Sequence, residues 1–189
     1  VIVARVYGAY GTFELPVTDD DPATPQTPTV VIRDSGVALL VPELVEAFLA
    51  AGVRRFPLQV VTASRRLQRL LKSNINLNAA AAGIERVVSS GSALTHLELR
   101  LGLPTETAGE AAATIRWARE STAHTATFLP GKDVDLGPAW TATAEDDYDD
   151  FPALRRRALL SFYGRPRRAA RLSRSLPRLI PDLVAGARP

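Results

Sequence analysis

Leu-Thr-His-Leu-Glu-Leu-Arg-Leu, residues 94–101, is the stretch that decides the fold class. Every second residue from Thr95 to Leu101 falls in one set, which is apolar apart from its first member. The interleaved set consists of His96, Glu98 and Arg100. Because successive side chains of a strand point to opposite faces, a period of two predicts a half-buried strand with one polar face.

Helix and strand signals follow this strand directly. Thr107 and Glu110 have the spacing of a capping box, in which each residue satisfies a backbone N–H of the other. The helix that this box opens is expected to run to about Ser121. The Thr-rich segment 122–129 is then predicted to be another strand, ended by Pro130 and Gly131.

The segment before residue 94 also alternates strands with helices. Pro42 suits the first position of a helix, where its missing N–H is not needed, and Gly52 suits the end of that helix. Residues 56–61 predict a strand, and Ser64 is the predicted cap of a second helix. Asn78 is the predicted cap of a third helix.

The chain opens with a predicted β-hairpin over residues 1–17, with a glycine-rich turn near its middle. The order of strands and helices predicts an α+β fold, a mixed α/β two-layer sandwich with a C-terminal basic helical arm. The predicted units are a domain over 1–144, an acidic linker over 145–150 and an Arg/Leu-rich arm over 151–189.

Charge is distributed unevenly along the chain. From Phe151 to Pro189 there are 10 Arg and a single acid, Asp182, so this segment carries +9. The first 150 residues carry −6, and the net charge of +3 conceals this contrast. The acidic run from Glu145 to Asp150 lies at the junction and is predicted to be a solvated hinge or an internal counter-charge for the arginines.

The arginine-rich segment is the predicted binding region. Its interleaved Leu and Ile residues favour docking on a neighbouring protein subunit in a homo- or hetero-oligomer, because Arg forks pair well with carboxylates. Nucleic acid is the alternative partner, since the same arginines suit phosphates and two aromatic residues could stack on bases. A membrane-surface helix is the third option. The binding residues are predicted to be Arg155, Arg156, Arg157, Phe162, Tyr163, Arg165, Arg167, Arg168, Arg171, Arg174 and Arg178.

The leading prediction is therefore a non-enzymatic structural or interaction subunit, with no catalytic residues, metal or cofactor. The alternative from another class is a metal-assisted hydrolase that uses Glu145 to Asp150 together with His124 or His96. His96 and Glu98 share a strand face, so a His-Glu-His site with His124 is also geometrically conceivable.

Composition sets the remaining limits. The chain of 189 residues is 46% hydrophobic, enough for a substantial core. It has no Cys, which excludes disulfides and thiolate chemistry and is most consistent with a reducing compartment such as the cytoplasm. No apolar run approaches the roughly 18 residues that predict a transmembrane segment.

Overall fold

A parallel sheet forms the centre of the molecule. The structure is a computed structural model that describes residues 2–8, 11–17, 35–36, 40–51, 53, 55–73, 75–132 and 151–174. In these residues the sheet has four strands in chain order, all parallel to their neighbours. The strands are β3 (Ser35–Gly36), β4 (Arg55–Val61), β5 (Leu94–Leu101) and β6 (Thr125–Pro130).

The predicted N-terminal hairpin is also present. It consists of β1 (Ile2–Gly8) and β2 (Gly11–Val17), which pair antiparallel from Ile2 opposite Val17 to Gly8 opposite Gly11. These two strands make a separate sheet. The described residues thus combine helices with a small parallel sheet, in agreement with the predicted mixed α and β class.

The helices occupy the connections between strands and follow the last strand. Their bounds are α1 (Pro42–Ala50), α2 (Arg65–Leu70), α3 (Leu77–Ser90), α4 (Ala108–Glu120) and α5 (Phe151–Tyr163), and residues 166–174 are helical again.

Most of the predicted helix ends are confirmed. Pro42 is the first residue of α1, and the Ser64 side chain accepts a hydrogen bond from the N–H of Leu67 at the start of α2. The capping box of Thr107 and Glu110 is complete in both directions. These short-range signals specify local structure because the Ser64 cap and the capping box satisfy N–H groups that the first helical turn leaves without partners, and Pro42 has no N–H to satisfy.

The predicted cap of α3 is wrong by two residues. Asn76, not Asn78, caps this helix, and its Oδ1 accepts from the N–H groups of Asn78 and Ala79, each at 3.1 Å. Leu77 is therefore the first helical residue. Both asparagines are good caps in isolation, so the local sequence alone did not separate them.

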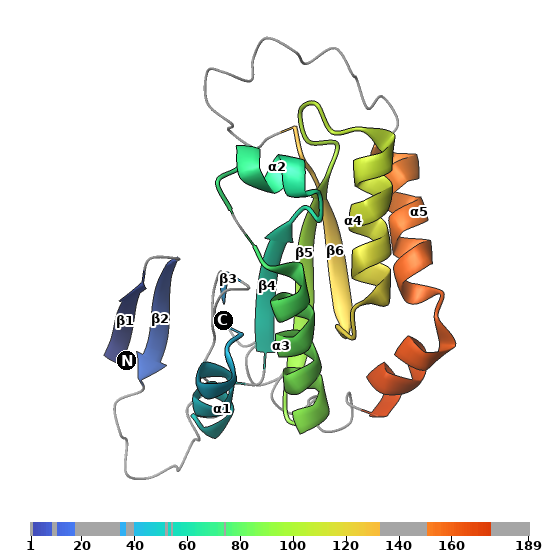
Figure 1. The fold of residues 1–189 in the computed structure, drawn as a ribbon. Coiled ribbons are helices and arrows are strands. Elements are labelled where there is room, and N and C mark those ends of the chain that lie inside the picture. Colours follow the sequence, from blue (N-terminus) through green and yellow to red (C-terminus); the bar gives the residue numbers. More distant parts are fainter. Residues whose placement is uncertain are drawn as a thin grey trace.

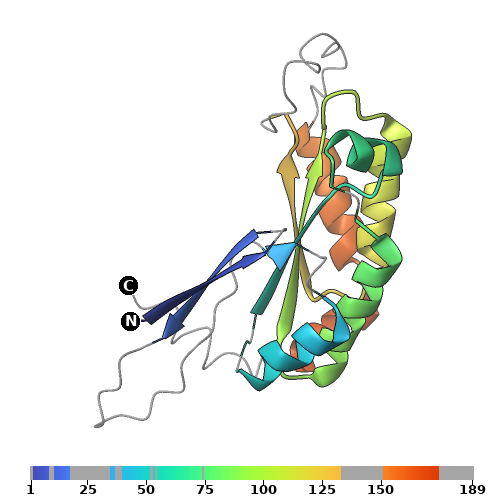
Figure 2. The same cartoon turned by 60° about the vertical axis from the view of Figure 1, so that its left-hand side comes forward.

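All the helices lie on one face of the parallel sheet. Connections between parallel neighbours are almost always right-handed, and here each connection advances to the next strand in the same direction. Repeating that step places each successive helix on the same side, which Figure 2 shows with the sheet seen nearly edge-on. Figure 1 shows α4 and α5 side by side. The described residues place no helix on the opposite face.

The core lies between the strands and this helical layer. Burial alternates strictly along β5, where Leu97, Leu99 and Leu101 are fully buried, as the sequence predicted. The helices between the strands contribute apolar residues to the same cluster, and α5, which follows the last strand, also contributes. The largest buried side chains of the cluster include Phe56, Leu58, Ile84, Leu97, Leu99, Phe128 and Phe162.

The segment predicted to be a separate C-terminal arm begins as part of this core. Ala158 and Phe162 of α5 are fully buried in the same hydrophobic cluster as the sheet. The helix packs against α4 and β6. The described part of the segment, 151–174, is therefore a further layer element of the body, because its apolar face completes the core that β6 and α4 begin. Residues 175–189 and the acidic run 145–150 lie outside the described residues.

Gly83 in the middle of α3 has a packing role. A Cβ at this position would contact the Leu40 side chain and lie 2.7 Å from the Leu40 carbonyl oxygen. Leu40 is buried and leads into α1. The absence of a side chain at Gly83 thus allows the backbone before α1 to pass directly against α3.

We expect Gly83→Ala to destabilise the protein by about 1–3 kcal/mol, because overpacking outweighs the roughly 1 kcal/mol that Ala gains in helix propensity. Gly109→Ala in α4 is the matched control, since the nearest atom to a Cβ there is the Thr107 hydroxyl oxygen at 3.9 Å. This control should be neutral or stabilising. Urea denaturation followed by circular dichroism measures both, and stabilisation by both changes would contradict the packing role.

Candidate functional site

We call the face of the parallel sheet that no described helix covers the open face. Strand β5 carries a row of polar side chains on this face. His96, Glu98 and Arg100 of β5 are each half-buried and alternate with the buried leucines. The neighbouring strands present Gln59 on β4 and Thr127 on β6 directly opposite Glu98. The prediction that His96 and Glu98 share a strand face is therefore confirmed, and this polar row is the candidate site.

His96 is held between two threonines of β6. Its Nδ1 lies 2.8 Å from the Thr125 hydroxyl and its Nε2 lies 3.2 Å from the Thr127 hydroxyl. Burial lowers the pKa of His96, Arg55 lowers it further, and Glu98 partly opposes them. A lowered pKa favours the neutral imidazole, which offers one donor and one acceptor nitrogen to the two hydroxyls.

The two charged members of the row make weaker contacts. The Glu98 carboxylate accepts a hydrogen bond of 3.4 Å from the Gln59 amide on β4. The Arg100 guanidinium donates to the Pro130 carbonyl at 3.0 Å, at the end of β6. A carboxylate has about four acceptor positions and a guanidinium has five donors, so these single contacts leave hydrogen-bonding capacity on both groups.

The spacing of the row defines what it can bind. Alternate residues on a strand lie about 6.6 Å apart, and neighbouring strands lie about 4.8 Å apart. The distance between the acceptor at Glu98 and the donor at Arg100 is thus similar to the length of a small molecule. The arrangement can hold a ligand that carries a cationic or donor group and, a few bonds away, an anionic group.

A buried carboxylate lies in the loop after β5. Glu106 is almost fully buried, and its Oε2 accepts from the N–H of Gly102 at 2.6 Å and of Leu103 at 3.3 Å. Burial raises the pKa of Glu106 to about 7, although these two backbone hydrogen bonds oppose the shift. Sites of parallel β/α proteins lie in loops at the carboxyl ends of strands, and this loop is at that edge.

A charged network ties this loop to the helices. Arg66 of α2 makes a two-point contact with Glu110 of α4, with Nε–Oε1 at 2.9 Å and Nη2–Oε2 at 2.7 Å. The Ser64 hydroxyl donates to the same carboxylate at 2.6 Å, and Arg66 also donates to the Thr105 carbonyl. The Arg66 hydrogen bond lowers the pKa of Glu110 to about 2, so this carboxylate stays ionised and fixes the loop position.

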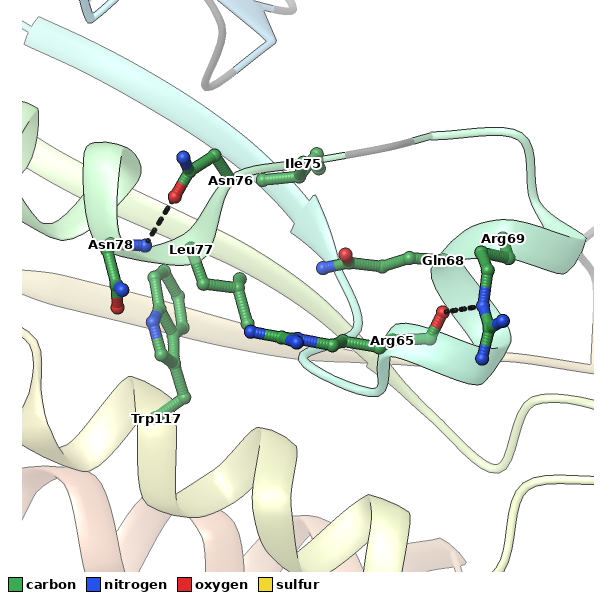
Figure 3. Close-up of a pocket in the computed structure, with 8 residues that line it drawn as sticks. All are labelled: Arg65, Gln68, Arg69, Ile75, Asn76, Leu77, Asn78 and Trp117. Atoms are coloured by element: carbon green, nitrogen blue, oxygen red, sulfur yellow. Dashed lines mark hydrogen bonds between the residues drawn. The ribbon is translucent and has the colours of Figure 1, made fainter.

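A hollow of about 750 Å³ lies elsewhere, between α2, the start of α3 and α4 (Figure 3). Figure 3 shows Arg65 extending from α2 toward Leu77 and Trp117, whereas Arg69 donates to the Arg65 carbonyl. No residue of the sheet lines this hollow, so it is separate from the polar row. Its lining consists of Arg65, Gln68, Arg69, Ile75, Asn76, Leu77, Asn78 and Trp117.

The structure does not bring His124 to His96 and Glu98. His124 lies on the buried side, where its Nδ1 accepts from the Thr95 N–H at 3.2 Å. Burial, followed by Arg171 and Arg168, lowers the pKa of His124 to about 4. Thr95 belongs to the helix-facing set of β5 whereas His96 belongs to the open face, so the two histidines are on opposite sides. Within the described ranges, no three His, Cys, Asp or Glu side chains form a metal-binding group.

Three of the predicted binding arginines donate to backbone carbonyls of the body. Arg168 is buried and donates to the carbonyls of Ala123, Arg119 and Ser121 at 2.7, 2.9 and 3.0 Å. Arg165 donates to the Arg119 carbonyl at 3.0 Å, and Arg171 donates to the Thr122 carbonyl at 2.6 Å. We call these three residues the arginine clamp. Cations at a helix C-terminus pair favourably with its carbonyl groups, so the clamp caps α4 and the turn into β6.

The two predicted aromatic contacts are also engaged within the body. Phe162 is fully buried, and the Arg168 guanidinium lies 3.4 Å from the centroid of its ring. The Tyr163 hydroxyl bonds with both the N–H and the carbonyl of Ala126. Phe162 is therefore not available to stack on a base in this fold. The predicted residues that remain exposed are Arg155, Arg156, Arg157, Tyr163, Arg165, Arg167 and Arg174, and Arg178 lies outside the described residues.

The sequence missed the inward arginines for a physical reason. Arg165, Arg168 and Arg171 are spaced by three and so share a helix face, which was a visible signal. Their acceptors, however, are backbone carbonyls more than forty residues earlier, and carbonyls have no sequence signature. Glu106 was missed because only its loop geometry buries it.

Comparison with known proteins adds little to this picture. No family model matches the chain, and no curated protein matches it. Among solved structures, coproporphyrinogen III oxidase (HemN) from Escherichia coli, described as a radical SAM enzyme, has a TM-score of 0.49 at 14% identity. The likeness covers 77% of this chain and 31% of that chain, so this chain spans under a third of that protein. A likeness at this level carries no inference here. The described residues include no helix that is long and apolar enough to cross a membrane.

We predict that Glu106 makes stability fall with rising pH. Its pKa is about 7 in the folded protein against 4.5 for an ordinary Glu, so the folded state holds the proton more tightly. This contribution is largest below pH 4.5 and declines until pH 7, by about 3 kcal/mol at most. Glu106→Gln should remove that slope.

Urea denaturation across that pH interval tests the prediction, with Glu85→Gln on the exposed side of α3 as the control. The control should keep the slope of the unchanged protein. If Glu106→Gln keeps it as well, Glu106 does not retain its proton in the folded state.

The arginine clamp leads to a stability prediction. Arg168→Met keeps most of the side-chain volume but removes the hydrogen bonds to the carbonyls of Ala123, Ser121 and Arg119, of which only the Arg119 carbonyl keeps a donor in Arg165, so it should cost about 2–4 kcal/mol. Arg167→Met changes an exposed neighbour and should cost less than about 0.5 kcal/mol. Urea unfolding midpoints compare the two, and equal midpoints would show that the clamp adds nothing to folding.

Proposed function

We propose that the open face of the β4–β6 sheet is a binding surface for a small polar molecule that carries both a donor or cationic group and an anionic group. Amino acids and their simple derivatives are the ligand class that fits this description. The proposal rests on one observation: a parallel sheet presents His96, Glu98 and Arg100 on a face that no described helix covers.

The composition of the face supports this function. Strands of parallel sheets that are covered on both sides read as nearly continuous apolar runs. β5 instead places a polar residue at each of three successive outward positions, which is costly beneath a dry layer. Three successive polar residues are consistent with a solvent-accessible surface that binds a ligand.

Each polar residue has a distinct role in the proposal. Glu98 accepts the ligand's ammonium or donor group, and Arg100 binds its carboxylate or other anion. His96, held neutral between Thr125 and Thr127, is a positioning residue that keeps the centre of the face rigid. Glu106, whose pKa is raised, lies in the loop after the carboxyl end of β5, the same end at which Arg100 lies. Raised or lowered pKa values concentrate at functional sites.

The experiment is an NMR titration with L-amino acids at millimolar concentration, observed at the His96 ring. Their N-acetyl and methyl ester forms each lack one charge and serve as ligand controls. We expect Glu98→Gln and Arg100→Gln to weaken binding about tenfold or more, corresponding to loss of one charged contact. Arg116→Gln on the exposed side of α4 should leave binding unchanged.

Two results would overturn the proposal. If no L-amino acid shifts the His96 signals, the face does not bind this class of ligand. If the N-acetyl and ester forms bind as well as the parent amino acids, Glu98 and Arg100 do not recognise the two charges.

Docking on a neighbouring subunit, the role expected from the charge pattern, stays a prediction for the outer side of α5. One observation favours it: Leu160 is 65% exposed among the exposed arginines of that helix. The metal-assisted hydrolase also stays a prediction, and its acidic run lies outside the described residues.

A further inference from the structure

A second, basic pocket lies where α4 ends and the chain turns into β6. Its volume is about 420 Å³. The helix at 166–174 forms one wall, and Figure 1 shows this helix beyond the end of α5. Because α4 leads into the start of β6, the pocket is at the opposite edge of the sheet from the Glu106 loop. It is lined by Glu120, Ser121, Thr122, Arg165, Pro166, Arg167, Arg168 and Arg171.

The charge of this pocket is strongly positive. Its lining contains four arginines and one glutamate, a formal charge of +3. The end of α4 contributes about half a negative charge through its carbonyl groups, and the arginine clamp already binds those carbonyls. The helix end therefore offsets only a small part of the positive charge.

Two of the arginines have donors to offer. Arg167 is exposed and has no hydrogen-bond partner among the residues that the structure places. Arg165 is exposed and uses one of its terminal nitrogens on the Arg119 carbonyl. Arg168, by contrast, is buried with both terminal nitrogens engaged, so its contribution is to the charge of the pocket and to its shape.

Two residues that line the pocket also carry buried polar groups. The Thr122 hydroxyl and the Arg168 Nε–H are buried, and neither has a hydrogen-bond partner in the described part of the chain. Both groups can donate. Buried donors that stay unmatched destabilise a fold, and bound ions or water are the usual explanation for them.

We propose that this pocket is an anion site for a single phosphate group, bound mainly by the guanidinium groups of Arg165 and Arg167. A phosphate supplies several acceptor oxygens to planar Arg forks, and its double negative charge matches the excess of positive charge. A nucleic-acid backbone is a different ligand, because it needs a long row of cations and not one concave site. The site is independent of the polar row on the open sheet face.

The test is thermal unfolding and calorimetric titration of the whole chain with inorganic phosphate, against chloride at matched ionic strength. We expect phosphate to raise the Tm, and Arg165→Gln or Arg167→Gln to weaken phosphate binding about tenfold each. Arg155→Gln, exposed on α5 and outside the pocket lining, is the control and should bind phosphate normally. Arg168 is left unchanged because its loss would disturb folding.

The outcomes separate the alternatives. Absence of any Tm rise with phosphate would overturn the proposal. An equal loss of binding in Arg155→Gln would show general charge attraction and would also overturn it. If a single-stranded DNA oligonucleotide binds while inorganic phosphate does not, the arginines act as a nucleic-acid surface instead. Normal phosphate binding by Glu98→Gln is expected, since that residue belongs to the other face.

Discussion

Strands that pair in chain order, joined by right-handed connections, place the connecting helices α1 to α4 on the same side of the sheet, and α5 packs on that side against α4 and β6. The core follows from that constraint, because the leucines of β5 and the apolar faces of α3, α4 and α5 meet on one side only. No described helix covers the other side, where the polar residues of β5 lie. A parallel sheet with helices on both faces would have required apolar residues where His96, Glu98 and Arg100 stand.

Part of the basic segment has a use inside the fold. A reading of the basic segment as an arm assumes that its arginines await a partner. The arginine clamp shows a different use, in which guanidinium groups satisfy the carbonyls where α4 ends. Such contacts are charge-assisted, and they are shielded from water because Arg168 is buried against Phe162. The pocket beside the clamp keeps a net positive charge after these carbonyl contacts are made.

The fold was predictable where neighbouring residues carry the information. The alternation in 94–101, the cap at Ser64 and the box of Thr107 and Glu110 act over a few residues, and the structure contains each of them. His96 and Glu98 share a face for the same reason. The His-Glu-His site that the sequence left geometrically conceivable does not form among the described residues, because His124 lies on the buried side of the sheet, away from His96 and Glu98. The internal contacts of Phe162 and Arg168 could not be predicted because their partners come from distant segments, and the local pattern of Arg and Leu suits a buried helix as well as a docking surface.

The position of α5 also bears on how the chain is made. A ribosome releases the N-terminal segments first, and domains tend to fold as units once enough of the chain has emerged. Here β6 and α4 appear well before Phe162 and Arg168, which cover them. Until those residues leave the ribosome, the end of α4 has no cap from the clamp and β6 lacks its packing against α5. During synthesis there is therefore an interval in which the strands of the sheet have emerged but the core lacks the residues of α5. This interval ends only when the basic segment has left the ribosome.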